Sequence, residues 1–161
     1  MKKLYIVRHA KSSWKFDVID HDRPLNDRGL SDAPLVATHI AEKFKTPDLF
    51  LSSDALRAKT TAVFFAQAFQ VSDKQIELDH KLYDFAGKDL VEVVQRLNDK
   101  FESVMLFGHN NAITNFVNTY GDVLIDNVAT TGFTAIEFDI TSWKDLKPGK
   151  TIYTIVPKEL K

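Results

Sequence analysis

Cysteine is absent from this sequence of 161 residues. The chain therefore has no disulfide bond, no thiolate nucleophile and no cysteine-based zinc site, and its composition fits a reducing compartment. An excess of charge of one sign is missing too, because the formal net charge is -1 at pH 7. No overall basic field would attract nucleic acid or an anionic membrane, so any positive potential must be local.

Long hydrophobic runs are also missing. No stretch reaches the roughly 18 apolar residues of a membrane-spanning helix. Residues 1–3 precede a short apolar run and not the longer hydrophobic region of a signal peptide. We therefore expect a cytoplasmic protein without a membrane or nucleic-acid partner. The length suits a single domain over residues 1–161. The sequence leaves the oligomeric state open, although a monomer is favoured.

Short apolar runs alternate with helical patterns along most of the chain. The runs predict strands at residues 3–7, 49–52, 75–78 and 104–107. Helical spacing predicts helices that end near residue 44 and that span about 54–69, 88–98 and 112–119. From Phe133 onward, two β-rich runs are joined by a loop at residues 147–150. This order predicts a doubly wound α/β fold, a three-layer sandwich with a mostly parallel central sheet and an antiparallel edge strand or hairpin near the C-terminus.

Two helix starts depend on which residue provides the N-cap. For the first helix, a cap at Ser31 would place Pro34 in the first turn at little cost, whereas a cap at Asn26 would place it deeper and kink the helix. The sequence does not decide between these two starts. For the second helix, Ser53 or Asp54 offers the capping oxygen.

Three of the predicted strands end on cationic or imidazole side chains. Arg8 and His9 follow the first strand, Arg57 lies in the first turn of the helix after the second strand, and His109 follows the run at 104–107. Ligands of open parallel sheets bind beyond the carboxyl ends of the strands. We therefore expect these four side chains to converge on one site, although they are far apart in the sequence.

Two arginines and two histidines suit an anion. Arginine next to the site repels cations, and no carboxylate or thiolate stands at a matching spacing, so we expect no metal and no cofactor. Guanidinium groups pair with phosphoryl oxygens, and helix N-termini add partial positive charge. The predicted ligand is a phosphoryl dianion.

Four segments resemble the histidine phosphatase superfamily: RHA at 8–10, DRPLNDRG at 22–29, SSDALRAKTTA at 52–62 and GHN at 108–110. The resemblance runs from residue 4 to about residue 138. With its short length, the chain looks like the small SixA-type branch, whose characterised members remove phosphate from phosphohistidine on signalling proteins. One departure is Ala10, where the superfamily commonly has glycine. Because the backbone must approach the phosphate there, Ala10 requires a negative φ or a tolerated strain.

The resemblance implies a phosphatase in which neutral His9 attacks phosphorus and forms a phosphohistidine that water hydrolyses. Arg8, Arg57 and His109 would hold the phosphoryl oxygens. Arg23 matches an additional arginine of the SixA-type branch and would join them. The expected partner is a phosphorylated protein or a small phosphorylated substrate.

The general acid is less evident from the sequence. A phosphate ester leaves as an alkoxide and benefits from a proton, which larger members of the superfamily supply from a Glu or Asp. The region after Ile76 offers Glu77, Asp79 and Asp84, of which Asp84 is the candidate. A chain without such an acid would suit phosphohistidine, because an imidazole, with an ordinary pKa of about 6.5, leaves far more easily than an alkoxide.

Two other functions are compatible with the same residues. One is a phosphomonoesterase for a small phosphorylated metabolite, which a functional acid at Asp84 would favour. The other is a non-catalytic phosphate-binding module, which would not require His9. The remaining histidines, His21, His39 and His80, are expected to be structural or exposed. Two loop aromatics, Trp14 and Phe16, would either wall the entrance of the site or cover the edge of the core.

Overall fold

A six-stranded mixed sheet forms the centre of the protein, and the computed structural model describes all residues, 1–161. The strand order is β3-β2-β4-β1-β5-β6. The strands are β1 (Lys2–Arg8), β2 (Leu49–Ser52), β3 (Ile76–Leu78), β4 (Ser103–Gly108), β5 (Phe133–Phe138) and β6 (Lys150–Ile155). The helices are α1 (Asp27–Lys43), α2 (Leu56–Ala68), α3 (Lys88–Gln95) and α4 (Ala112–Tyr120). No helix has the length and apolar character needed to cross a bilayer.

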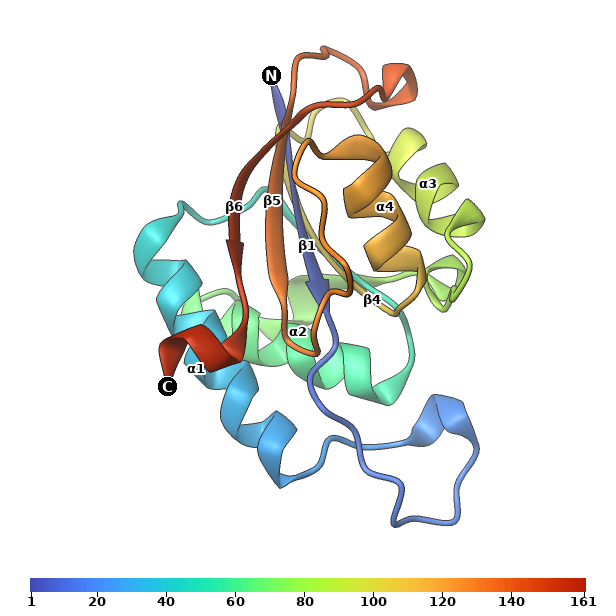
Figure 1. The fold of residues 1–161 in the computed structure, drawn as a ribbon, viewed down its shortest axis with the longest axis vertical. Coiled ribbons are helices and arrows are strands. Elements are labelled where there is room, and N and C mark those ends of the chain that lie inside the picture. The colour runs from blue at the N-terminus through green and yellow to red at the C-terminus, as the bar shows by residue number, and fades with distance from the viewer.

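The sheet changes direction at β1. Strands β3, β2, β4 and β1 pair in parallel, whereas β5 runs antiparallel to β1, and β6 runs antiparallel to β5. Helices α1 and α2 cover one face, and α3 and α4 cover the other (Figure 1). These observations confirm the predicted α/β sandwich with a mostly parallel sheet and an antiparallel C-terminal hairpin.

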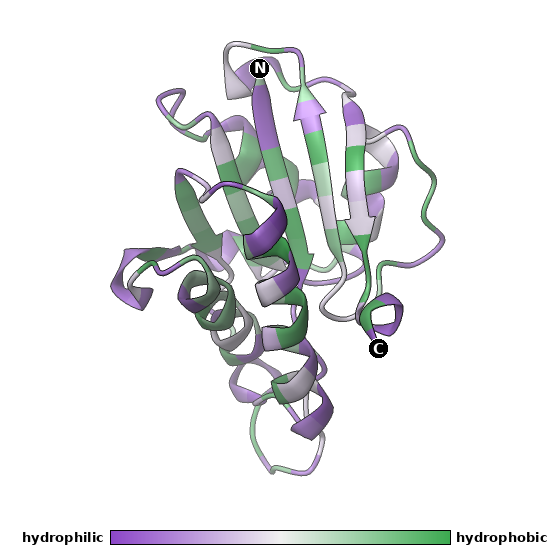
Figure 2. Cartoon of the chain, turned by 90° about the vertical axis from the view of Figure 1, so that its left-hand side faces the viewer, coloured by the Kyte–Doolittle hydropathy of each residue, from purple (hydrophilic) through white to green (hydrophobic).

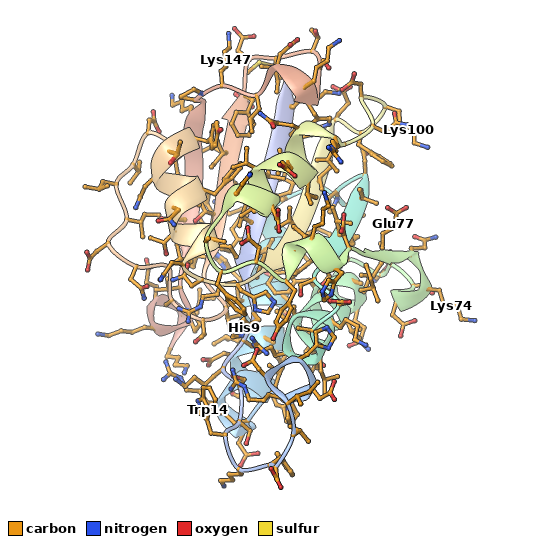
Figure 3. The ribbon with its side chains drawn as sticks, turned by 90° about the vertical axis from the view of Figure 1, so that its right-hand side faces the viewer. His9, Trp14, Lys74, Glu77, Lys100 and Lys147 are labelled. Atoms are coloured by element: carbon orange, nitrogen blue, oxygen red, sulfur yellow. The ribbon has the colours of Figure 1, made fainter.

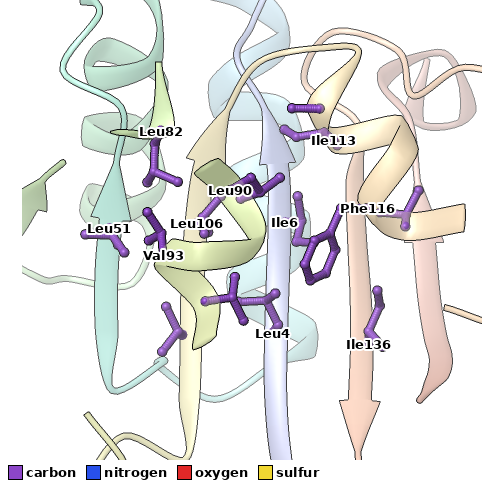
Figure 4. Packing of buried hydrophobic residues seen from close by; sticks show 14 of the residues in the cluster. Leu4, Ile6, Leu51, Leu82, Leu90, Val93, Leu106, Ile113, Phe116 and Ile136 are labelled. Atoms are coloured by element: carbon purple, nitrogen blue, oxygen red, sulfur yellow. The ribbon is translucent and has the colours of Figure 1, made fainter. Parts of the chain in front are cut away.

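Side chains of β1 alternate between the two helical layers. Leu4 and Ile6 pack with α3 and α4, as Figure 4 shows, whereas Tyr5 and Val7 pack with α1 and α2. The central strands are mainly hydrophobic along their length (Figure 2), as expected for strands that are covered on both faces. Truncation of a fully buried residue such as Ile6 to alanine would cost about 2–5 kcal/mol. The sheet is therefore a rigid support for groups at its carboxyl edge.

The first helix begins at the earlier of its two expected positions. Asn26 is the N-cap of α1, and its side-chain oxygen accepts a hydrogen bond of 2.9 Å from the Gly29 N–H. Pro34 therefore lies inside the helix, which continues to Lys43. Because Pro34 has no N–H, one hydrogen bond of α1 is missing at this point.

The predicted cap of α2 is wrong. The helix begins at Leu56, and its N-cap is Ala55, which has no capping side chain. Ser53 Oγ accepts a hydrogen bond of 3.2 Å from the Ala55 N–H, one residue before the helix. The Asp54 carboxylate instead contacts two histidines from other segments. Tertiary partners have thus replaced the local capping interaction.

Candidate active site

The main chain at His9 forms hydrogen bonds with two neighbouring segments, one on each side. His9 N–H donates to the Gly108 carbonyl at 3.1 Å, at the end of the neighbouring strand β4. On the other side, Thr131 N–H lies 3.0 Å from the Arg8 carbonyl and 3.1 Å from the His9 carbonyl. These bonds fix the direction in which the His9 side chain leaves the carboxyl edge of the sheet. Figure 3 shows His9 at this edge and Trp14 on the loop beyond it.

A cavity of about 260 Å³ opens at this edge. It brings together the four residues expected from the strand ends and Arg23, which the family resemblance adds. Its lining consists of Arg8, His9, Lys11, Ser12, Trp14, Asp20, Arg23, Arg57, Phe85, His109, Asn110 and Thr130. Trp14 is thus part of the cavity wall, whereas Phe16 is not.

The His9 ring is held in one tautomer. Its Nδ1 lies 2.7 Å from the Ala10 carbonyl oxygen, which can only accept, so Nδ1 carries the proton and Nε2 carries the lone pair. Burial lowers the pKa of His9 to about 3; the bond to the Ala10 carbonyl opposes this, and the charges of Arg57 and Arg8 add to it. At neutral pH, His9 is therefore an uncharged imidazole with a free nitrogen, as a nucleophile requires.

His109 lies beside His9 and is also neutral. The two ring centroids are 5.2 Å apart, and His109 is 1% exposed. Burial, followed by the influence of His9 and Arg57, lowers the pKa of His109 to about 2. Its Nε2 lies 2.9 Å from Ser53 Oγ, whose hydrogen can be donated to it. The proton of His109 then resides on Nδ1, which is buried and has no partner in the protein.

The Asp20 carboxylate joins two of the arginines. Arg57 donates to Asp20 Oδ2 at 2.9 Å and to the Asp20 carbonyl at 2.7 Å, and Arg23 Nε donates to Asp20 Oδ1 at 3.0 Å. Tyr83 donates its hydroxyl to Asp20 Oδ2 at 2.5 Å. Burial alone would raise the pKa of Asp20, but the bonds from Tyr83, Arg57 and Arg23 outweigh it and hold that pKa well below its usual range. Asp20 is therefore ionised.

Arg8 and Arg23 each make a further contact at the cavity wall. Arg8 donates to the Val128 carbonyl at 2.8 Å. The Arg23 guanidinium lies 3.5 Å from the centre of the Trp14 ring, within the range of a cation–π interaction. No sequence pattern marks Asp20 or Tyr83 as a site residue. The sequence offers only weak hints of them: Asp20 stands three residues before Arg23, and Tyr83 directly precedes Asp84.

Asp84 does not line the cavity. Its carboxylate accepts hydrogen bonds, each of 3.0 Å, from the backbone N–H groups of Ala86, Gly87 and Leu90. Protonation would remove part of this acceptor capacity, so this arrangement argues against Asp84 as the general acid. Glu77 and Asp79 line a separate cavity of about 560 Å³ between α3 and strands β2 and β3. The structure thus brings none of the three candidate acids to His9.

Ala10 fits the site without backbone strain. Apart from Gly87, only Gln70 and Thr131 have a positive φ. The Ala10 N–H donates to Thr61 Oγ1 at 2.9 Å, and its methyl group is fully buried. Of the two alternatives for Ala10, a negative φ or a tolerated strain, the structure has the negative φ.

Comparison with known proteins agrees with this geometry. Residues 4–123 match the model of the histidine phosphatase superfamily (branch 1), and the chain belongs to this superfamily. The structure superposes on a protein of Agrobacterium tumefaciens assigned as the phosphohistidine phosphatase SixA. The TM-score is 0.82 and the identity 26%, over 97% of this chain and 98% of the other.

Two curated relatives are similar in sequence over part of their length. An uncharacterised chloroplastic protein of Arabidopsis thaliana is 33% identical over 118 residues, which are 68% of this chain and 54% of that protein. Phosphoserine phosphatase 1 of Hydrogenobacter thermophilus is 31% identical over 110 residues, 63% of this chain and 49% of that protein. The match therefore spans about half the length of these relatives.

Proposed function

We propose that the protein is a phosphatase that removes phosphate from phosphohistidine on a protein, through a covalent phosphohistidine intermediate on His9. The proposal rests first on the neutral, oriented His9 ring among three arginines and His109. It rests also on the absence of a proton-donating carboxyl group in the cavity. The similarity to SixA-type structures agrees with it.

In the first step, the lone pair of His9 Nε2 attacks the phosphorus of the substrate. A new P–N bond forms as the P–N bond of the substrate breaks, and the departing ring, already protonated on its other nitrogen, leaves as neutral imidazole. In the second step, water attacks phosphorus, and the electron pair of the P–Nε2 bond returns to His9. Inorganic phosphate leaves with the protons of that water. Division of one hard transfer into two easier ones is the benefit of a nucleophile.

Arg8, Arg57 and His109 stabilise the charge on the transferring group. In the transition state this charge is spread over three oxygens, and donors that are already in place gain most there. Asp20 keeps two guanidinium groups oriented, because each of its oxygens accepts from a different arginine. We assign Asp20 to positioning and not to proton transfer.

The observation that carries the choice of substrate is the state of Asp20. It is the only carboxylate that lines the cavity, and its depressed pKa keeps it ionised and thus a poor acid. An alkoxide needs such an acid, whereas an imidazole leaves without one. The cavity therefore favours a phosphoramidate over a phosphate ester.

A phosphomonoesterase for a small metabolite is the second candidate. The similarity to phosphoserine phosphatase 1 favours it. For this function Asp20 would have to accept a proton once a phosphoryl dianion occupies its arginine partners. Substrate preference separates the two candidates.

The test compares turnover of a phosphohistidine-bearing carrier protein with turnover of p-nitrophenyl phosphate. The variants are His9→Ala and, as a matched control, His39→Ala, which removes a histidine on α1 far from the cavity. We expect rapid His9-dependent dephosphorylation of the carrier, poor ester turnover, and acid-labile label on His9 after quenching.

The opposite preference would support the metabolite phosphatase. If neither substrate turns over and His9→Asn binds phosphate as well as the parent, the protein is a phosphate-binding module and our proposal is wrong.

A further inference from the structure

Three metal-ligating side chains meet at the rim of the candidate active site, outside the phosphate cavity. They are His21 in the short 3-10 turn Asp20–Asp22, Asp54 before α2, and His80 in the 3-10 turn His80–Leu82. His21 Nε2 lies 2.9 Å from Asp54 Oδ1, and His80 Nδ1 lies 2.9 Å from Asp54 Oδ2. One donor atom from each of the three residues lies within 4.8 Å of the others.

From this geometry we propose that His21, Asp54 and His80 bind a divalent transition-metal ion, with zinc as the best fit. Zinc binds imidazole nitrogen and carboxylate oxygen at about 2.0–2.2 Å, so tetrahedral ligands lie about 3.3 Å apart. The nitrogen–oxygen separations of 2.9 Å are somewhat shorter than this value, and all three donor atoms lie within 4.8 Å of one another. Two imidazoles and one carboxylate are a recognised zinc donor set that leaves a fourth position for water.

The surroundings of the three residues suit an ion that enters from solvent. The side chain of His80 is 73% exposed, whereas those of His21 and Asp54 are 28% and 30% exposed. His80 can therefore adjust its ring at little cost while the other two remain in place. The fourth coordination position would face water.

Asp22 supports His21 from the opposite side of its ring. Asp22 Oδ1 lies 3.6 Å from His21 Nδ1. When an ion occupies Nε2, the ring proton resides on Nδ1, and a carboxylate beside it favours that tautomer. In the metal-free protein, by contrast, both contacts to Asp54 require a proton on the nitrogen that faces it. The cluster can thus change from two hydrogen bonds to three metal bonds with little movement.

The catalytic pair is a much poorer site for a cation. His9 Nδ1 is occupied by the Ala10 carbonyl, and the charges of Arg8 and Arg57 face the rings. The proposed cluster has no arginine partner. A metal ion would therefore be expected at His21, Asp54 and His80 and not at His9.

An ion at this position would hold together the segments that shape the phosphate cavity. His21 follows Asp20, Asp54 precedes Arg57 by three residues, and the His80 and Tyr83 ring centroids are 5.8 Å apart. The Asp20 carboxylate bonds both Arg57 and Tyr83. The ion would be structural: it would cross-link these segments and take no part in the chemical step.

The test measures binding of Zn²⁺ alone to tag-free protein that has been freed of metal with a chelator. Isothermal titration calorimetry in a buffer without phosphate gives the stoichiometry and affinity, and Co²⁺ gives the visible absorption of a tetrahedral site. We expect one ion per chain and a Tm higher by roughly 8 °C at a free Zn²⁺ concentration 100 times Kd. His80→Ala should lower the affinity at least tenfold, and His39→Ala should not change it.

A second variant, Asp54→Asn, shows whether the loss of binding in His80→Ala reflects removal of a ligand or a disturbed fold. It should also lose binding, with its fold confirmed by circular dichroism. The proposal is overturned if the parent binds no Zn²⁺, or if binding survives both variants and disappears in His9→Ala. Because binding is measured without substrate, either result leaves the proposed phosphatase function untouched.

Discussion

Acidification should destabilise the protein through the buried imidazole of His9. Its pKa is lowered to about 3 in the native state, mainly by burial, whereas an unfolded chain has the ordinary value of 6.5. Between these two values, the unfolded chain binds a proton that the native protein does not. The free energy of unfolding therefore falls as the pH decreases from 6.5 toward 3.

The size of this loss in unfolding free energy is set by protonation of His9 in the unfolded chain. At pH 5 the ordinary imidazole is protonated, and this stabilises the unfolded chain by about 2 kcal/mol relative to pH 8. Any native pKa below about 4 gives nearly the same result at pH 5, so the prediction does not depend on its exact value. His109, whose pKa is lowered to about 2, should contribute a similar loss.

Urea denaturation of the parent and of His9→Asn at pH 8 and pH 5 isolates the contribution of His9. Carboxylates and the other histidines contribute to the pH dependence of both proteins and cancel in the comparison. The parent should lose about 2 kcal/mol more stability than the variant between the two pH values. Equal losses would mean that native His9 takes up a proton at its ordinary pKa, and the argument for a neutral nucleophile would fail.

Three further changes test the site and its supports. Arg57→Ala should lower kcat by about 100-fold or more, because it removes a donor that stabilises the transition state, and steady-state kinetics would show this; an unchanged kcat would refute that role. Asp84→Ala should lower the free energy of unfolding by about 1–3 kcal/mol by leaving N–H groups unpaired, while kcat is retained. A large loss of kcat in a stable Asp84 variant would restore it as an acid. Gly29→Ala, normally favourable in a helix by about 1 kcal/mol, should here lower Tm, because the added Cβ would overlap the Lys11 carbonyl; a higher Tm would contradict this packing.

The site residues that the sequence patterns predict stand at the ends of helices and strands. Apolar runs end at Arg8 and at Gly108, and the rule for open sheets places the residues after them at one edge. Helical and strand periodicity is local, so the positions of β2 and α4 also follow from a few consecutive residues.

The residues that the sequence did not reveal depend on how a loop folds back. Asp20 meets Arg57 across 37 positions of sequence, and no local pattern encodes that contact. Asp54 is one of the two expected caps of α2, beside Ser53, but two histidines from distant segments compete for its carboxylate. Asp84 was chosen by its place in the chain, whereas its orientation is set by three N–H groups just after it.

The backbone bonds on both sides of His9 divide the cavity into a fixed part and an adaptable part. The fixed part is the sheet edge, where neighbouring segments bond the His9 main chain on each side. The adaptable part is the exposed stretch of residues 14–19, of which Trp14 lines the cavity, whereas Asp20 and Arg23 after it are bonded to Arg57 and Ser12. If the proposed function holds, variation in this loop will alter which phosphorylated partner is accepted while the orientation of His9, the proposed nucleophile, stays the same. A library randomised at residue 14 and its neighbours would explore new substrates without rebuilding the chemistry.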